Sequence, residues 1–126
     1  MNQVVLVGRI VREIELRTVN DNRAVVNNVI AVNRKHRDKQ GELQTDFINF
    51  VAWGNLASLL EKYCQKGQRI AISGPIHSRS YVTQDQQTRY LTEVLVQDLT
   101  LLDRPQNRET EDEPVQFGMG ADAILS

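Results

Sequence analysis

The sequence has few residues of the kinds that carry out catalysis or cross-link a chain. Its 126 residues include one cysteine and two histidines. The single cysteine, Cys64, excludes a disulfide framework and is typical of a reducing compartment. Because so few histidine and cysteine ligands are present, we expect no metal site and no cofactor. Neither His36 nor His77 lies in a nucleophile, metal or phosphate-binding motif, so the chain is predicted not to be an enzyme.

Long apolar runs are missing as well. The sequence contains no stretch of eighteen consecutive apolar residues, which is the length that a membrane-spanning helix needs. The first twelve residues are too few and too charged for a secretory signal, so we expect a cytoplasmic protein. The length fits one domain with its own core and a short tail.

The net charge is close to zero, which by itself argues mildly against a nucleic-acid partner. The charge is unevenly distributed, however. Residues 1–103 carry 13 basic and 11 acidic side chains, whereas residues 104–126 carry 2 and 5. The tail contains the acidic cluster Glu109–Glu113 and its first half has almost no apolar residues, a composition that does not fold by itself. We therefore predict a domain over 1–103 and a disordered acidic tail over 104–126.

Hydrophobic periodicity predicts a chain made mostly of strands. The predicted strands are 4–11, 24–33, 45–53, 69–73 and 88–96, with a half-exposed strand at 13–18, an extended stretch at 76–83 and a closing segment at 99–102. The first strand is apolar on both faces, so it is either central in the sheet or covered by a second chain. The polar run between residues 34 and 44 is predicted to be a long hairpin loop.

One helix interrupts the strands. An apolar stripe that includes Leu56, Leu60 and Cys64 predicts a helix from Asn55 to Lys66, with Asn55 as its N-cap and Cys64 in the core. The resulting order of three strands, one helix and two strands is typical of the OB-fold, a five-stranded Greek-key barrel. Periodicity alone does not separate this fold from other small barrels.

Aromatic residues are sparse, but their positions are informative. Phe47 and Trp53 share one face of the third strand, and Tyr81 stands beside Arg79. The run Arg34–Lys39 adds four cations and one anion. Proteins that bind single-stranded nucleic acid need flat rings for the bases and cations for the phosphates. The alternative is that Phe47 and Trp53 belong to the core and that the basic run is only a solvated loop.

Taken together, the motifs of residues 1–103 resemble the bacterial single-stranded DNA-binding proteins, a homotetrameric OB-fold family. The matching motifs, in order along the chain, are Met1-Asn2-x-Val4-x-Leu6-x-Gly8-Arg9, Glu15-Leu16-Arg17, Ala31-Val32-Asn33-Arg34, Thr45-Asp46-Phe47-Ile48-Asn49, Val51-Ala52-Trp53-Gly54-x-Leu56-Ala57, Lys66-Gly67, Ile72-x-Gly74, Ser78-Arg79-Ser80-Tyr81 and Arg89-Tyr90-x-Thr92-Glu93-Val94. Each motif is weak by itself, and the ordered set is specific.

The resemblance implies sequence-independent binding of single-stranded DNA, which protects it in replication, recombination and repair. The implied stacking residues are Phe47, Trp53, Tyr81 and, at a position that is usually aromatic in the family, His36. The implied phosphate-binding residues are Arg9, Arg34, Lys35, Arg37, Lys39 and Arg79. The resemblance also implies a homotetramer that pairs through the first strand, association with the nucleoid, and docking of replication and repair proteins on the acidic tail segment Glu109–Phe117.

Three other functions stay open from the residues alone. An OB-fold can serve as a protein-interaction module that binds DNA only weakly, and the histidine at position 36 and the divergent tail favour this alternative. An RNA-binding OB domain is not excluded by the barrel. An OB-fold hydrolase is the remotest alternative, because no clustered acid, base or metal ligand is visible.

Overall fold

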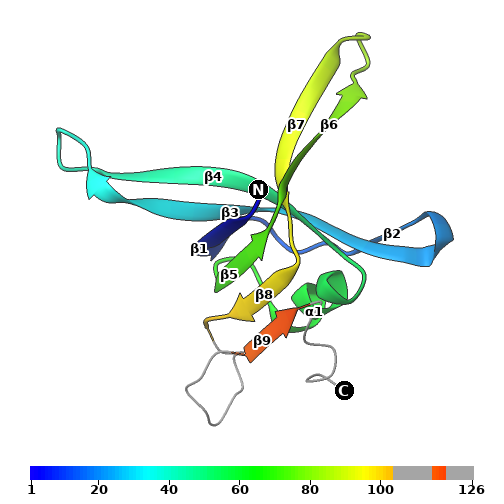
Figure 1. Ribbon diagram of the computed structural model, residues 1–126, viewed down its shortest axis with the longest axis horizontal. Coiled ribbons are helices and arrows are strands. Elements are labelled where there is room, and N and C mark those ends of the chain that lie inside the picture. Colours follow the sequence, from blue (N-terminus) through cyan, green and yellow to red (C-terminus); the bar gives the residue numbers. More distant parts are fainter. Residues whose placement is uncertain (104–114, 119–126) are drawn as a thin grey trace.

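The computed structural model describes residues 1–103 and 115–118, except for the side chains of Asp21 and of 115–118, and these residues form one sheet and one helix (Figure 1). The elements, in chain order, are β1 (Val4–Ile10), β2 (Arg17–Val19), a 3-10 turn (Asn20–Asn22), β3 (Arg23–Arg37), β4 (Leu43–Trp53), α1 (Asn55–Tyr63), β5 (Arg69–Gly74), β6 (Ile76–Val82), β7 (Thr88–Leu95), β8 (Asp98–Leu101) and β9 (Val115–Gly118). The strand order in the sheet is β6-β7-β4-β3-β1-β5-β8-β9, and β2 pairs with β3. No helix in this part of the chain is long and apolar enough to cross a membrane.

The strand pairing follows the predicted OB topology, with one difference. β1 pairs antiparallel with β3 and β5, β3 with β4 and β6 with β7, while β4 and β7 run parallel. The hydrogen-bonded sheet does not close into a ring, and β5 and β6 are separate strands on either side of Pro75, which has no N–H for a ladder. At this corner the Leu95 N–H donates to the Pro75 carbonyl over 2.9 Å and the Gln97 N–H donates to the Ser73 carbonyl over 2.8 Å.

The core lies between the inner faces of the strands and α1. Its largest fully buried side chains are Phe50, Ile10, Ile30, Leu60, Ile70, Ile72, Leu99, Val26 and Val94. Cys64 is buried in the same cluster, so its predicted place in the core is confirmed. The helix is shorter than predicted and begins differently. Gly54, not Asn55, is the N-cap. The turn from β4 into α1 requires a positive φ at this residue, 61°, which glycine adopts without a steric penalty.

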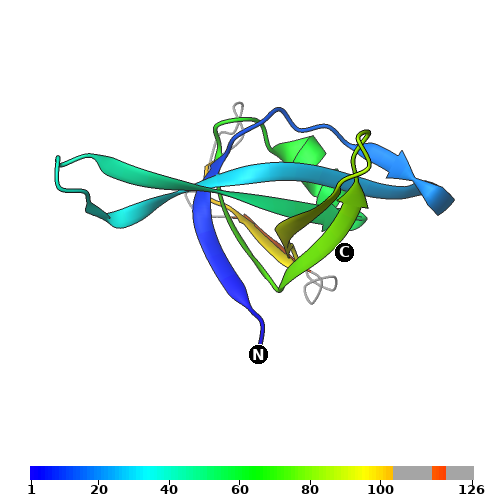
Figure 2. The ribbon, with the colours of Figure 1, turned by 90° about the horizontal axis from the view of Figure 1, so that it is seen from above.

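The predicted long loop between residues 34 and 44 is mostly strand. β3 continues to Arg37 and β4 begins at Leu43, so the two strands form a protruding ribbon, the β3–β4 arm, that leaves the body of the protein (Figures 1 and 2). Asp38 closes its tip, where the carboxylate accepts hydrogen bonds from the N–H groups of Gln40 and Glu42. The polar composition of residues 34–44 correctly predicted that they are exposed. It did not exclude a strand, because a two-stranded ribbon can be solvated on both faces.

One further expectation about the first strands is corrected, and β1 takes the central place in the sheet that was one of its two predicted alternatives. Residues 13–16 are not a strand, because the backbone of the preceding Arg12 is held by the buried side chain of Asn28, which hydrogen-bonds to both its N–H and its carbonyl at 3.1 Å. β1 is not buried on both faces within one chain. Val5 and Val7 are 70% and 52% exposed on the outer face.

Part of the predicted disordered tail is a strand. β9 (Val115–Gly118) pairs antiparallel with β8, in a register that joins Asp98 to Gly118 and Leu101 to Val115. The acidic cluster Glu109–Glu113 and the end of the tail lie outside the described residues. The edge of β8 is therefore covered by a segment of the same chain.

Gly74 is required at the corner between β5 and β6, and its replacement tests this arrangement. A Cβ atom at Gly74 would lie 1.9 Å from the carbonyl oxygen of Leu95. Gly74→Ala is expected to lower the free energy of unfolding by about 3 kcal/mol, because the two backbones must separate. Gly41→Ala is the control, since a Cβ there meets nothing within 4 Å and costs only about 1 kcal/mol of backbone strain at φ of 80°. Urea denaturation of both variants measures the difference, and equal losses would contradict the close approach.

Candidate nucleic-acid interface

The pairing of β3 with β4 decides which way the predicted aromatic residues point. Ala31 pairs with Phe47 and Val25 pairs with Trp53, so both aromatic residues lie on the same face of the ribbon. Phe47 is 66% exposed, whereas Phe50, on the opposite face, is fully buried in the core. The alternative that Phe47 is a core residue is therefore wrong. Trp53 follows Phe47 by six positions, which corresponds to about 20 Å along the strand.

Trp53 is half-buried at the end of β4 and is covered by a cation that the sequence did not single out. The guanidinium carbon of Arg23 lies 4.4 Å from the centroid of the Trp53 ring. Arg23 is exposed and begins β3, directly after the 3-10 turn. The contact arises across the hairpin, which is why no pattern along the chain indicated it.

The β6–β7 hairpin, here called the β6–β7 arm, carries Tyr81 away from the body (Figure 1). Tyr81 pairs with Arg89 and is exposed on the same face as Arg79 and His77. Tyr90 is also exposed, but it pairs with Ser80 and therefore lies on the opposite face of this arm. The two tyrosines thus present aromatic surfaces in opposite directions.

A buried carboxylate holds Arg79 and His77 at the base of the β6–β7 arm. Glu93 is only 3% exposed, and its Oε2 accepts a hydrogen bond from Arg79 Nε at 3.1 Å. The same oxygen lies 2.8 Å from His77 Nε2. The charge of Arg79 is therefore already matched by a carboxylate in the free protein. The ion pair also fixes where its guanidinium stands relative to Tyr81.

The basic run lies on the β3–β4 arm. Its residues border a shallow hollow of about 490 Å³, which is lined by Arg34, Lys35, His36, Arg37, Asp38 and Gln44. Arg34 is bound to Asp46 by two hydrogen bonds of 3.0 and 2.8 Å. This contact raises the pKa of Arg34 and lowers the pKa of Asp46. Arg37 donates to the carbonyl of Gly41, while Lys35 and Lys39 have no carboxylate at ion-pair distance in the described part of the chain.

The last predicted cation, Arg9, belongs to the body of the sheet. Arg9 pairs with Ala31, which pairs with Phe47, so Arg9 and Phe47 lie in one row on one face. The guanidinium of Arg9 donates to the carbonyl of Gly67 at 2.9 Å and lies 3.8 Å from Asp103. The structure therefore brings Arg9, Phe47 and Trp53 together on the sheet. It places His36 on the β3–β4 arm and Tyr81 with Arg79 on the β6–β7 arm.

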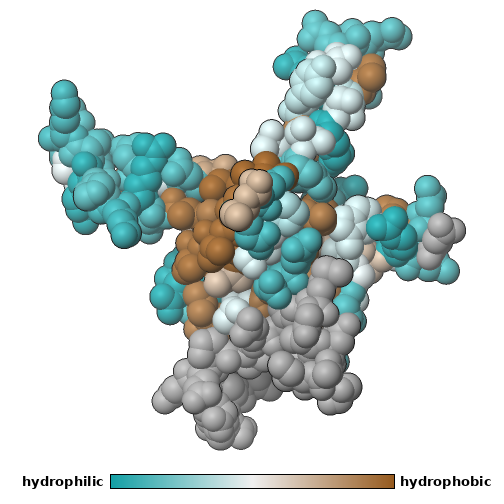
Figure 3. Space-filling view, viewed as in Figure 1, coloured by the Kyte–Doolittle hydropathy of each residue, from teal (hydrophilic) through white to brown (hydrophobic). Residues whose placement is uncertain are grey.

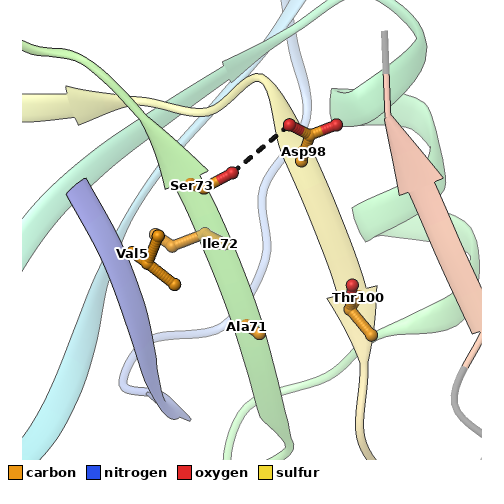
Figure 4. A pocket seen from close by; sticks show the side chains of 6 residues that line it. All are labelled: Val5, Ala71, Ile72, Ser73, Asp98 and Thr100. Carbon is orange, nitrogen blue, oxygen red and sulfur yellow. Dashed lines mark hydrogen bonds between the residues drawn. The ribbon is translucent and has the colours of Figure 1, made fainter. Parts of the chain in front are cut away.

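A second exposed surface covers the outer face of β1, β5 and β8. Val5 pairs with Ser73, which pairs with Asp98, and Val7 lies beside them on the same face. The side chains border a shallow hollow of about 240 Å³, where the Ser73 hydroxyl donates to Asp98 at 3.3 Å (Figure 4). Hydrophobic surface gathers where β1 and β5 lie in Figure 1 (Figure 3). This surface carries both apolar and polar side chains, and it continues along β1 to Arg9, which lies on the same face two residues after Val7.

Catalytic chemistry finds no support in the geometry. Cys64 is buried, and burial raises the pKa of its thiol from 9.0 to about 12, so it is not a nucleophile. The residues that the structure describes contain no group of three or more histidine, cysteine or acidic side chains that could hold a metal ion. The arrangement offers aromatic rings and cations on open surfaces, which suits the binding of an extended, flexible polyanion.

Comparison with known proteins identifies the family. The pattern that describes the Single-strand binding protein family matches residues 1–102. The chain belongs to this family. The single-stranded DNA-binding protein of Streptococcus mutans is 38% identical over 118 residues, which are 94% of this chain and 72% of that protein. Single-stranded DNA-binding protein B of Bacillus subtilis is 38% identical over 86% of this chain and 95% of its own length.

A solved structure extends the comparison to three dimensions. An SSB from Plasmodium falciparum, in complex with single-stranded DNA, superimposes with a TM-score of 0.73 at 29% identity, over 82% of this chain and 96% of that chain. The resemblance inferred from the motifs and the OB-fold class are thereby confirmed. Single-strand binding proteins are a binding family without catalytic activity, so the prediction that the chain is not an enzyme is confirmed by the family to which it belongs.

The buried thiol gives a direct test of this part of the structure. At about pH 8, a thiol whose pKa is near 12 is almost entirely protonated, whereas an exposed thiol is partly ionised and reacts as the thiolate. Cys64 in the folded protein is expected to react with Ellman's reagent at least about 100-fold more slowly than in concentrated guanidinium chloride. Equal rates in the two solutions would mean that the thiol is open to solvent.

Proposed function

We propose that this protein binds single-stranded DNA without sequence preference and protects it in replication, recombination and repair. The observation that carries the proposal is the shared face of Phe47 and Trp53 on β4, in a chain that belongs to the Single-strand binding protein family. Two rings on one open face offer separate platforms for bases. Every base has a flat face, so stacking of this kind does not depend on sequence.

The stacking residues in this proposal are Phe47, Trp53, Tyr81 and His36. Phe47 and Tyr81 are exposed, which is what an incoming base requires. His36 is exposed on the β3–β4 arm and offers a smaller ring. The DNA follows a path over the sheet face of β3 and β4 and along the two arms, so that bases leave one ring and reach the next.

The phosphate-binding residues in this proposal differ in how free their charges are. Arg34 and Arg79 are held by carboxylates in the free protein, and Arg9 lies near Asp103. Lys35, Arg37 and Lys39 are not paired with carboxylates in the described residues. A cation that is already paired gains less from a phosphate, so the log–log salt slope should lie between about −4, if all six cations contact phosphates, and about −2, if only these three do.

The assembly and the partners follow from the same proposal. The domain covers 1–103, and four copies assemble through the outer face of β1. Exposure of Val5 and Val7 on a strand in the middle of the sheet supports this, since large apolar side chains on an open face are typical of an interface. Replication and repair proteins dock on the acidic tail segment Glu109–Phe117. Through its bound DNA, the protein is associated with the nucleoid.

The first experiment is a titration with oligo-dT that follows the emission of Trp53, the only tryptophan. Saturating oligo-dT should quench this emission, because bases stack on the indole. Tyr81→Ala is expected to weaken binding by about 1–3 kcal/mol, the loss of one stacked base. Tyr90→Ala is the matched control, because it removes an exposed tyrosine from the opposite face of the same arm.

The control should change the affinity by less than about twofold. Unchanged Trp53 emission at saturation would show that the indole is not a stacking platform. An equal loss of affinity in the two tyrosine variants would mean that the face of the β6–β7 arm has been assigned incorrectly.

The second experiment tests the assembly. Light scattering should give a mass of about 58 kDa for the intact protein, which is four times 14.4 kDa. The double variant Val5→Asp, Val7→Asp places two charges on the outer face of β1 and is expected to reduce the mass to that of a smaller species. Val82→Asp, an exposed valine on the β6–β7 arm, serves as the control and should leave the mass unchanged.

A further inference from the structure

Arg23 and Trp53 form a pair that no sequence motif includes. The guanidinium carbon of Arg23 stands 4.4 Å from the centroid of the indole. The register explains the contact, since Val25 pairs with Trp53 and Arg23 lies two residues before Val25 on the same face of β3. The two side chains are therefore diagonal neighbours, a position from which long side chains reach each other across a ribbon.

The charge of Arg23 is not neutralised by this contact. Among the side chains that the structure describes, which do not include that of Asp21, each ion pair involves Arg9, Arg34, Arg69, His77 or Arg79, and none involves Arg23. A cation over an aromatic ring keeps its full charge and gains only about 0.5–1 kcal/mol at an exposed site. The ring at the end of β4 is therefore accompanied by a positive charge.

The position of this charge fits a nucleotide at Trp53. A base that stacks on the indole carries its own phosphate to the edge of the ring, and the guanidinium is already there. An arginine fork matches a phosphate with two parallel hydrogen bonds, and it can keep contact with an aromatic ring at the same time. The same contact restricts the indole in the free protein, which lowers the entropy that is lost when a base stacks.

We propose that Arg23 is a DNA-contact residue of this chain, which orients the Trp53 ring and binds the phosphate of the nucleotide stacked on it. The proposal rests on the proposed function and adds a seventh cation to the six that the sequence indicated. Arg23 and Trp53 then act as one binding unit on the sheet, just as Tyr81 and Arg79 stand together on the β6–β7 arm.

The test compares three variants of the full chain by titration with oligo-dT at several salt concentrations. Arg23→Gln removes the charge, and Arg23→Lys keeps the charge but loses the planar group. Lys66→Gln is the control, because it removes an exposed cation after α1, away from the aromatic residues on β4. Thermal unfolding of each variant checks that the exposed substitutions leave the fold intact.

Arg23→Gln is expected to weaken binding about fivefold at moderate salt and to make the log–log salt slope shallower by about 0.7, the contribution of one phosphate contact on a single strand. Arg23→Lys should keep the wild-type slope and bind with intermediate affinity. Lys66→Gln should change neither quantity by a comparable amount. The emission of Trp53 in the unbound protein should change in Arg23→Gln, because the cation leaves the ring.

The outcomes separate this proposal from the proposed function. If the wild-type protein neither binds oligo-dT nor shows quenching of Trp53, the proposed function fails. If the wild type binds and is quenched, but Arg23→Gln binds with the same affinity and slope, only the role of Arg23 is overturned. Tighter binding by Arg23→Gln would also overturn it, since Arg23 would then be a cover that the base must displace.

Discussion

The long antiparallel pairing of β3 with β4 is the constraint on which the rest of the structure depends. One register, running from Val25–Trp53 to Asn33–Thr45, decides the orientation of the side chains on both strands up to the irregularity that follows Asn33. This register directs the side chains of Ile30 and Phe50 into the core. A shift of one residue would exchange the two faces, bury Phe47 and expose Phe50. The stability of the core and the position of the candidate binding surface are thus fixed by the same set of hydrogen bonds.

Electrostatics organises the two arms differently from the sheet face. On the arms, Arg34 and Arg79 are held by Asp46 and Glu93, so their guanidinium groups have defined positions before any ligand arrives. Breaking such pairs costs part of the gain from a phosphate. On the sheet face, Arg23 is positioned by an aromatic ring, that of Trp53. The protein therefore combines arginines that are positioned by carboxylates with an arginine that is positioned by an aromatic ring.

The sequence was sufficient to predict the element order, the helix stripe and the shared face of Phe47 and Trp53, because these follow from periods of 2 and 3.6 residues. It was not sufficient to predict the length of the β3–β4 arm, since polar residues occur equally in loops and in solvated ribbons. It placed the helix N-cap at Asn55, because the geometry of the preceding turn that selects Gly54 is not visible in a hydrophobic pattern. The stacking of Arg23 on Trp53 and the burial of Glu93 depend on contacts between strands. They became visible only when the register was known.

The pairing of β9 with β8 moves the open edge at this end of the sheet from β8 to β9. An open strand edge is a row of unsatisfied N–H and carbonyl groups that invites pairing with any other extended chain. Here four residues from the far end of the sequence occupy that row, so the β8 edge is satisfied without a partner. A proteolytic cut between residues 104 and 114 would leave β9 attached only by its hydrogen bonds. Such a cut would first expose the unpaired edge of β8, which could then pair with other extended chains. The aromatic and basic surfaces would remain intact.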